Sequence, residues 1–183
     1  DIHTGDKDWD AAFALSQCAG FSLLFPPNQH LPNPSFVSAR GPDNGHSPKG
    51  DGTDYPASWS GQTPLEAYYL ASVLPASPAA KDALRNFLAA QKADGTIDGK
   101  PGLAGQRGRY LAAPMLASLA WRIYEAGGDD GFLKDAFPRL HEFFWSWFSP
   151  EYDEDRDGLP QWKHILQSGF EDNPLFDAWH PWS

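Results

Sequence analysis

Two adjacent carboxylates near the end of the chain, Glu171 and Asp172, are the residues best placed to transfer a proton. They lie in QSGFEDNPLFD, residues 167–177, between a glycine turn and an Asn-Pro, where a helix is expected to begin. A second negative charge and aromatic neighbours favour the protonated form of a carboxyl group, so one of the two is a candidate general acid. The other can cap the helix or bind a hydroxyl group. The alternative is an acidic helix start that only interacts with the helix dipole.

A second group of acids has the spacing of a calcium loop. Asp153, Asp155 and Asp157 alternate along DEDRDG, and Gly158 follows them. Oxygens at positions 1, 3 and 5 of such a loop converge on the ion, and the glycine turns the chain. His164 stands at the twelfth position, where a bidentate glutamate would complete the site. The motif therefore predicts either a calcium site or a loop closed by Asx turns without a metal.

Cations and tryptophans in the loops indicate ligand contacts. Arg107 and Arg109 flank a glycine in an acidic protein, so each is expected to meet a carboxylate of the protein or an anionic group of a ligand. Trp59, Trp162 and Trp179 offer flat apolar faces of the kind that stack on sugar rings. Packing in the core is the alternative for each of the three.

Composition excludes several classes of partner. The 183 residues carry a net charge of −10 and no basic run, so neither a nucleic acid nor an anionic membrane has a surface to bind. No run of about 18 apolar residues is present to span a membrane. We expect a soluble protein, with the cytoplasm preferred although the compartment is not defined. Cys18 has no partner for an internal disulfide and is expected to be a small buried hydrophobic residue.

Hydrophobic periodicity indicates the elements that must position these residues. Five helices are expected, and no strand pattern competes with them, so the fold class is all-α. The expected helices cover residues 6–24, 62–74, 77–91, 110–126 and a stretch from 129 or 130 to 148.

The connections between these helices alternate between long and short, which places the long loops on one face. The second and fourth helices are apolar nearly all round and are expected to be inner helices, whereas the third and fifth are amphipathic and are expected to be outer ones. A sixth segment begins at Asp177. The pattern predicts half of a two-layer ring of helical hairpins, completed by chain beyond Ser183 or by a partner that supplies the missing half.

Four short motifs then occur in a fixed order: WSGQ at 59–62, QKADGTI at 91–97, DRDGLPQW at 155–162 and SGFEDNP at 168–174. In this order they resemble the N-terminal half of an (α/α)6-barrel glycosidase. The similarity is to glycoside hydrolase family 63 and to mannosylglycerate-hydrolase-like enzymes, with trehalases as more distant relatives. It covers roughly residues 54–177 and implies that residues 1–183 form half of such a catalytic domain.

This resemblance implies cleavage of an α-glycosidic bond with inversion, by a general acid in a Ser-Gly-x-Asp motif and a general base on a later loop. Glu171 stands where the family usually has the acidic Asp, Asp172 where Asn is common, and Leu175 where Arg is frequent. Neighbouring residues in a helical turn point about 100° apart, whereas the acid and the base stand roughly 6.5 to 9.5 Å apart across the scissile bond. The base is therefore expected beyond Ser183, and residues 1–183 alone are expected to be inactive.

The resemblance also implies a substrate-binding set, in which Gln62 replaces a sugar-binding Asp. We expect the ligand to be an α-linked oligosaccharide or glycoside, with no required cofactor and calcium as the one ion that the sequence suggests. A non-catalytic carbohydrate-binding or scaffold protein on the same ring is the alternative, and an isomerase or lyase is a third option. The expected binding residues are Asp54, Tyr55, Trp59, Gln62, Arg107, Arg109, Trp162, Asp177 and Trp179.

Overall fold

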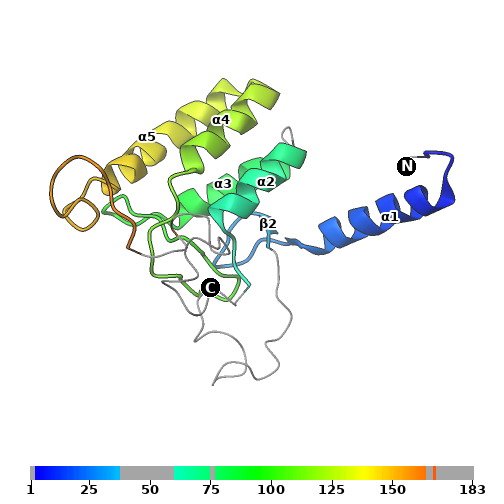
Figure 1. Ribbon diagram of the computed structural model, residues 1–183, viewed down its shortest axis with the longest axis horizontal. Coiled ribbons are helices and arrows are strands. Elements are labelled where there is room, and N and C mark those ends of the chain that lie inside the picture. The colour runs from blue at the N-terminus through cyan, green and yellow to red at the C-terminus, as the bar shows by residue number, and fades with distance from the viewer. Residues whose placement is uncertain (1–2, 38–59, 75–76, 164–166, 168–183) are drawn as a thin grey trace, which may run out of the picture.

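The computed structural model describes residues 3–37, 60–74, 77–163 and 167, and this part of the chain is mostly helical (Figure 1). The predicted helical class is therefore confirmed, and the architecture is consistent with part of an α/α toroid. That residues 1–183 form one half-barrel stays a prediction. In chain order the elements are α1 (Lys7–Ser22), β1 (Leu24–Phe25), β2 (Ser35–Phe36), α2 (Pro64–Val73), α3 (Pro78–Ala89), α4 (Leu116–Gly127) and α5 (Asp130–Ser146).

Local sequence signals explain where the helices begin. Thr63 and Glu66 form a capping box at the start of α2, in which the side chain of each residue binds the backbone N–H of the other. Ser77 caps α3 directly before a proline at the first helical position. Asp129 caps α5 by accepting a hydrogen bond from the backbone N–H of Phe132 at 3.0 Å. The boundaries of α2, α3 and α5 therefore lie within two residues of the predicted ones.

The body of the molecule consists of two helical hairpins that lie side by side, α2–α3 and α4–α5 (Figure 1). Helices α2 and α4 pack against each other, and α3 packs against both and against α5. The four helices thus form one packed body, and the assignment of α2 and α4 to an inner layer stays a prediction. One continuous apolar core joins the four helices, and its largest fully buried aromatic and aliphatic side chains are Phe87, Leu84, Ile97, Leu116, Leu119 and Ile123.

The fourth helix begins six residues later than predicted. Residues 110–113 are extended, because the backbone of Ala112 donates to Ile97 at 2.8 Å and that of Tyr110 accepts from Gly99 at 2.8 Å. Pro114 then directly precedes the turn that leads into α4 at Leu116. The apolar pattern of this stretch predicts a helix, whereas the structure has a buried strand-like segment that bridges Asp98 at Leu111.

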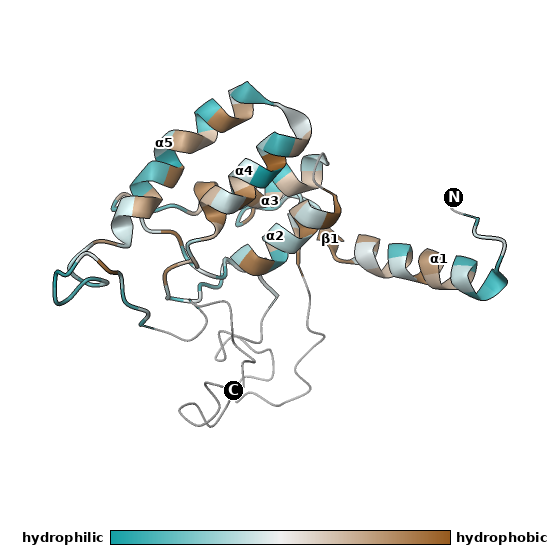
Figure 2. Cartoon of the chain, turned by 45° about the horizontal axis from the view of Figure 1, so that its top comes forward, coloured by the Kyte–Doolittle hydropathy of each residue, from teal (hydrophilic) through white to brown (hydrophobic). Residues whose placement is uncertain are grey.

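The N-terminal region corrects two further predictions. A short antiparallel pair, β1 with β2, follows α1, so the described part of the chain is not purely helical. Helix α1 projects away from the helical body, and none of its residues is buried (Figures 1 and 2). Cys18 is therefore exposed, contrary to the prediction that it is buried. Its apolar neighbours Trp9, Leu15 and Phe21 are exposed as well.

Within the described residues, no helix has both the length and the apolar character needed to cross a membrane.

Candidate functional site

The described part of the loop between α3 and α4 lies at the ends of α2 and α4 where these helices begin, and we call this end of the molecule the loop face (Figure 1). The loop between α3 and α4 lies beside the start of α2, where the backbone N–H of Gln62 donates to Pro101 at 3.0 Å and that of Leu103 donates to Ser60 at 3.1 Å. The side chain of Asn28 reaches the same loop by donating to the carbonyl of Leu103 at 3.1 Å. Three segments that are distant in sequence thus form one surface.

Gln62, expected to bind a sugar hydroxyl, is fully buried below this surface. Its amide Nε2 donates to the carbonyl of Ala83 at 2.6 Å, and its Oε1 accepts from the side chain of Asn86 at 3.2 Å. Asn86 in turn binds the Asn33 and Ser35 region of the β1–β2 hairpin. Both ends of the Gln62 amide are therefore occupied within the protein, and in this geometry the residue joins α2, α3 and the hairpin.

A buried carboxylate holds the backbone of the α3–α4 loop at Arg109, one of its two arginines. Asp98 accepts backbone hydrogen bonds from Lys100 at 2.9 Å, Gly108 at 2.8 Å and Arg109 at 2.9 Å. The guanidinium of Arg107 donates to the adjacent carbonyl of Gln106 at 2.9 Å. Among the described residues neither arginine forms an ion pair. Asp98 holds the backbone of Arg109 and not its side chain.

The acidic loop after α5 brings its three aspartates together. One carboxylate oxygen from each of Asp153, Asp155 and Asp157 lies within 4.8 Å of the other two. Oδ1 of Asp153 is buried and accepts no hydrogen bond from any described residue. The Asx turns of the metal-free alternative are present too, since the N–H of Leu159 donates to Asp157 at 2.8 Å. Convergent carboxylate oxygens are the donor set that calcium prefers.

Tyr152 anchors the base of this acidic loop. Its backbone carbonyl accepts a hydrogen bond from the N–H of Gln161, which closes the loop at its two ends. Its ring packs against the ring of Trp147 with centroids 5.4 Å apart. Burial, followed by the charge of Glu151, raises the pKa of Tyr152 above its ordinary value, so the hydroxyl stays neutral. The loop is thus attached to the apolar core through Tyr152.

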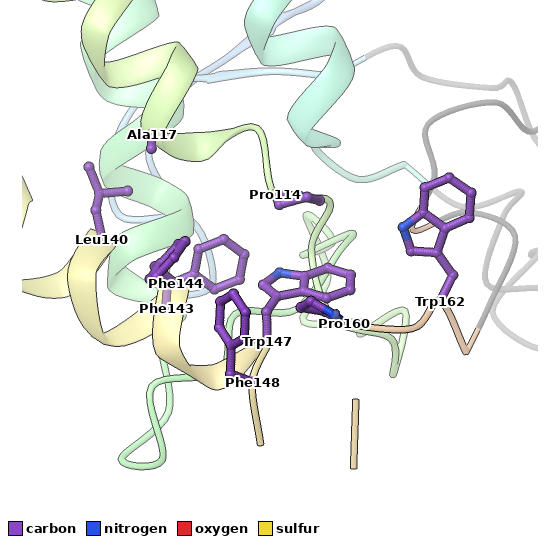
Figure 3. Close-up of a pocket in the computed structure, with 9 residues that line it drawn as sticks. All are labelled: Pro114, Ala117, Leu140, Phe143, Phe144, Trp147, Phe148, Pro160 and Trp162. Atoms are coloured by element: carbon purple, nitrogen blue, oxygen red, sulfur yellow. The ribbon is translucent and has the colours of Figure 1, made fainter. Parts of the chain in front are cut away.

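An apolar pocket of about 240 Å³ lies between the start of α4, the end of α5 and the acidic loop (Figure 3). Trp162 contributes one wall and is 54% exposed, whereas Trp147 at the centre is buried. The indole Nε1 of Trp147 has no hydrogen-bond partner among the described residues. The remaining lining residues are Pro114, Ala117, Leu140, Phe143, Phe144, Phe148 and Pro160.

The other predicted site residues lie outside the described part of the chain. These are the acid candidates Glu171 and Asp172 and the binding residues Asp54, Tyr55, Trp59, Asp177 and Trp179. The structure therefore neither brings them together nor separates them.

Comparison with known families decides what kind of domain this is. Residues 55–181, more than half of the chain, match the family described as "Mannosylglycerate hydrolase MGH1-like glycoside hydrolase domain". The chain belongs to this glycoside hydrolase family. The match confirms the predicted resemblance, and a carbohydrate is the class of substrate that this family implies. No curated protein sequence and no solved structure matches the chain.

Two residues of the loop face in this MGH1-like domain were not predicted from the sequence. Asp98 binds Gly108 and Arg109, ten and eleven residues further along, and the sequence alone carries no sign of that pairing. Trp147 follows α5 directly and reads as one more apolar residue of the helix stripe. A tryptophan immediately before a loop of Ser, Pro and acids is the one signal that could have singled it out.

Proposed function

We propose that this MGH1-like domain hydrolyses an α-glycosidic bond with inversion of configuration. The observation that carries the proposal is the family match over residues 55–181, which includes both the acidic loop and the stretch around Glu171. The gathering of the long loops on one face supports it, because glycosidase sites on helical rings need several loops around one sugar.

The proposed general acid is Glu171 or Asp172, which would protonate the oxygen of the departing group. Glu171 stands at the family's usual acid position, and an adjacent carboxylate would hinder the loss of its proton. The other residue of the pair would support the acid or bind a hydroxyl group. Since neighbouring residues cannot stand on opposite sides of the scissile bond, we place the general base, which activates water, outside residues 1–183.

The proposed substrate contacts come from the loops. Trp162 is exposed beside the apolar pocket and would offer a stacking face, and the guanidinium groups of Arg107 and Arg109 would donate hydrogen bonds. Gln62 is not part of this proposal, because its side chain is buried and both its Nε2 and its Oε1 are hydrogen-bonded within the protein. The remaining proposed contacts are Asp54, Tyr55, Trp59, Asp177 and Trp179.

We further propose that the acidic loop binds calcium through Asp153, Asp155 and Asp157. The ion would offset most of the charge of three neighbouring carboxylates and fix the loop that carries Trp162. Its contribution would be structural, and the proposed hydrolysis does not require it.

The rest of the ring is proposed to pack against α4 and α5. Large apolar side chains stay exposed on these helices, among them Trp121, Phe144 and Trp145, each more than half exposed. Large exposed apolar side chains of this kind favour a packing partner. Residues 1–183 alone are accordingly proposed to be inactive.

The test is the anomeric configuration of the first product. The full-length protein is incubated with α-linked disaccharides and with mannosylglycerate, the compound for which the family is named, and the reaction is followed by proton NMR. The proposal predicts that the β-anomer of the released sugar appears first. Initial release of the α-anomer would contradict inversion, and binding of these sugars without any turnover would favour a carbohydrate-binding protein.

A further inference from the structure

Asp98 is a buried acid whose carboxylate accepts hydrogen bonds from three backbone N–H groups. The residue is only 8% exposed. Its Oδ1 accepts from the N–H groups of Lys100 and Gly108, and its Oδ2 accepts from the N–H of Arg109. Such a carboxylate ties both ends of the 98–109 loop to one point, because a buried charge needs several donors to be stable.

Arg109 has an unusual backbone. Its φ is +59°, in the left-handed region that glycine and asparagine occupy more readily than other residues. The hydrogen bond from its N–H to Asp98 and the packing of Tyr110 after it support this conformation. The turn itself would accept Gly or Asn with less strain, so the geometry gives no structural reason for an arginine.

The neighbouring residues keep the direction of this turn fixed. The ring of Tyr110 fits against Gly99 and Gly108 so closely that a Cβ atom on either glycine would lie 2.0 or 2.5 Å from a ring carbon. The bridge between Asp98 and Leu111 closes the same loop. A long cationic side chain is thus exposed at the end of a rigid turn on the loop face. Strained residues in well-supported turns are frequently part of a functional site.

We propose that Asp98 is a positioning residue: it holds Arg109 in the left-handed conformation so that the guanidinium group is presented to the glycoside substrate. This inference rests on the proposed function. Asp98 itself touches no substrate and acts through the N–H of Arg109. The guanidinium donates to hydroxyl or carboxylate oxygens of the bound sugar, and fixing it in advance removes part of the ordering cost of binding.

The experiment is a double-mutant cycle in the full-length protein, with kcat, KM and Tm measured on p-nitrophenyl α-D-glucopyranoside and α-D-mannopyranoside. Arg109→Asn keeps a residue that tolerates the left-handed turn and removes the guanidinium. It is expected to raise KM about tenfold without lowering Tm, because a charged hydrogen bond to the ligand is lost. Arg156→Asn, the same change at the other left-handed arginine, gives the Tm change that strain relief alone produces.

Asp98→Asn is expected to lower Tm and to raise KM by a similar factor as Arg109→Asn. In the double variant KM should be no higher than in Arg109→Asn alone, because no guanidinium group remains to be positioned. Its Tm should still fall. The inference would be overturned if Asp98→Asn raised KM by the same factor in the wild-type protein and in the Arg109→Asn variant. If Asp98→Asn does not fold, Arg109→Asn decides alone, and an unchanged KM overturns the inference. A wild-type enzyme that neither hydrolyses nor binds either glycoside would instead show that the proposed function is wrong.

Discussion

Oδ2 of Asp153 accepts a hydrogen bond from the backbone N–H of Gly158 at 3.3 Å, while Oδ1 of the same carboxylate is buried and has no donor among the described residues. Gly158 has a φ of +84°, which turns the chain back over the acidic loop. One oxygen of Asp153 therefore shapes the loop, and the other would be available to the proposed calcium ion.

Calcium is predicted to stabilise the protein through this loop. At a calcium concentration of 100 times Kd, the free energy of unfolding should rise by about 2.7 kcal/mol. Differential scanning calorimetry with calcium or with EDTA measures the change. Asp153→Asn should abolish most of it, whereas Asp94→Asn, at an exposed Asx turn with Thr96, should not. Equal Tm values of the wild type in calcium and in EDTA would favour the metal-free loop.

Gln62 is predicted to contribute to stability and not to substrate binding. Gln62→Leu keeps the size of the side chain but removes both hydrogen bonds to Ala83 and Asn86. The loss should lower the free energy of unfolding by about 1–3 kcal/mol, because buried polar partners lose a bond. KM measured well below Tm should stay unchanged. Gln29→Leu, at an exposed glutamine, serves as the control for stability, and an increase in KM for Gln62→Leu with unchanged stability would return the residue to the binding site.

The close approach of Tyr110 to Gly99 predicts a strong asymmetry between two Gly→Ala substitutions. In Gly99→Ala the new methyl group would lie 2.0 Å from a ring carbon of Tyr110, so overpacking should cost about 1–3 kcal/mol. Gly127→Ala adds a methyl group with no atom within 4 Å at the end of α4 and should be neutral or stabilising by up to about 1 kcal/mol. Urea denaturation measures both. Similar destabilisation by the two changes would mean that the Tyr110 packing is not tight.

The ion pair between Lys81 and Asp129 predicts a pH dependence on the acid side. Lys81 lies 2.6 Å from the carboxylate, and this hydrogen bond, followed by that from the N–H of Phe132, lowers the pKa of Asp129 below 3.8. A lowered pKa means that the stabilisation is present above the ordinary value and is lost as the pH falls through the folded-state value.

Asp129→Asn keeps an N-cap acceptor but removes this titration. Between pH 5 and about pH 2, Tm of the wild type should therefore fall more steeply than Tm of the variant. Asp135→Asn, at an exposed position of the same helix, should leave the wild-type slope in place. Parallel curves of Tm against pH for the wild type and Asp129→Asn would show that the ion pair does not contribute to the pH dependence of stability.

The sequence predicted the helices well where local signals define them. Capping residues such as Thr63 and Ser77 and the apolar period of α5 are encoded within one or two turns of helix. The predicted start of α4 was wrong. The backbone of Ala112 pairs with Ile97, fifteen residues earlier, and local propensity does not indicate such a pairing. The predicted burial of Cys18 was wrong, because an apolar pattern does not indicate whether a helix has a packing partner.

The site was predicted in part. Motif spacing correctly grouped the three aspartates of the acidic loop, since an alternating pattern in a tight turn brings its oxygens together. The same kind of motif placed Gln62 at the substrate, and the structure shows it fully buried. A sequence motif aligns a residue with a position of the family but does not indicate how deeply its side chain is buried. The roles of Glu171 and Asp172 stay predictions.

The general acid is the centre of the proposed mechanism, and turnover of Glu171→Gln and Asp172→Asn in the full-length enzyme tests it most directly. One of the two substitutions should lower kcat on a natural α-linked disaccharide by about 10² or more, the loss expected for a general acid. The same variant should lose less on a p-nitrophenyl glycoside, whose leaving group needs less protonation. If neither substitution lowers kcat to this extent, the acid is not in this stretch and the account of the site is wrong.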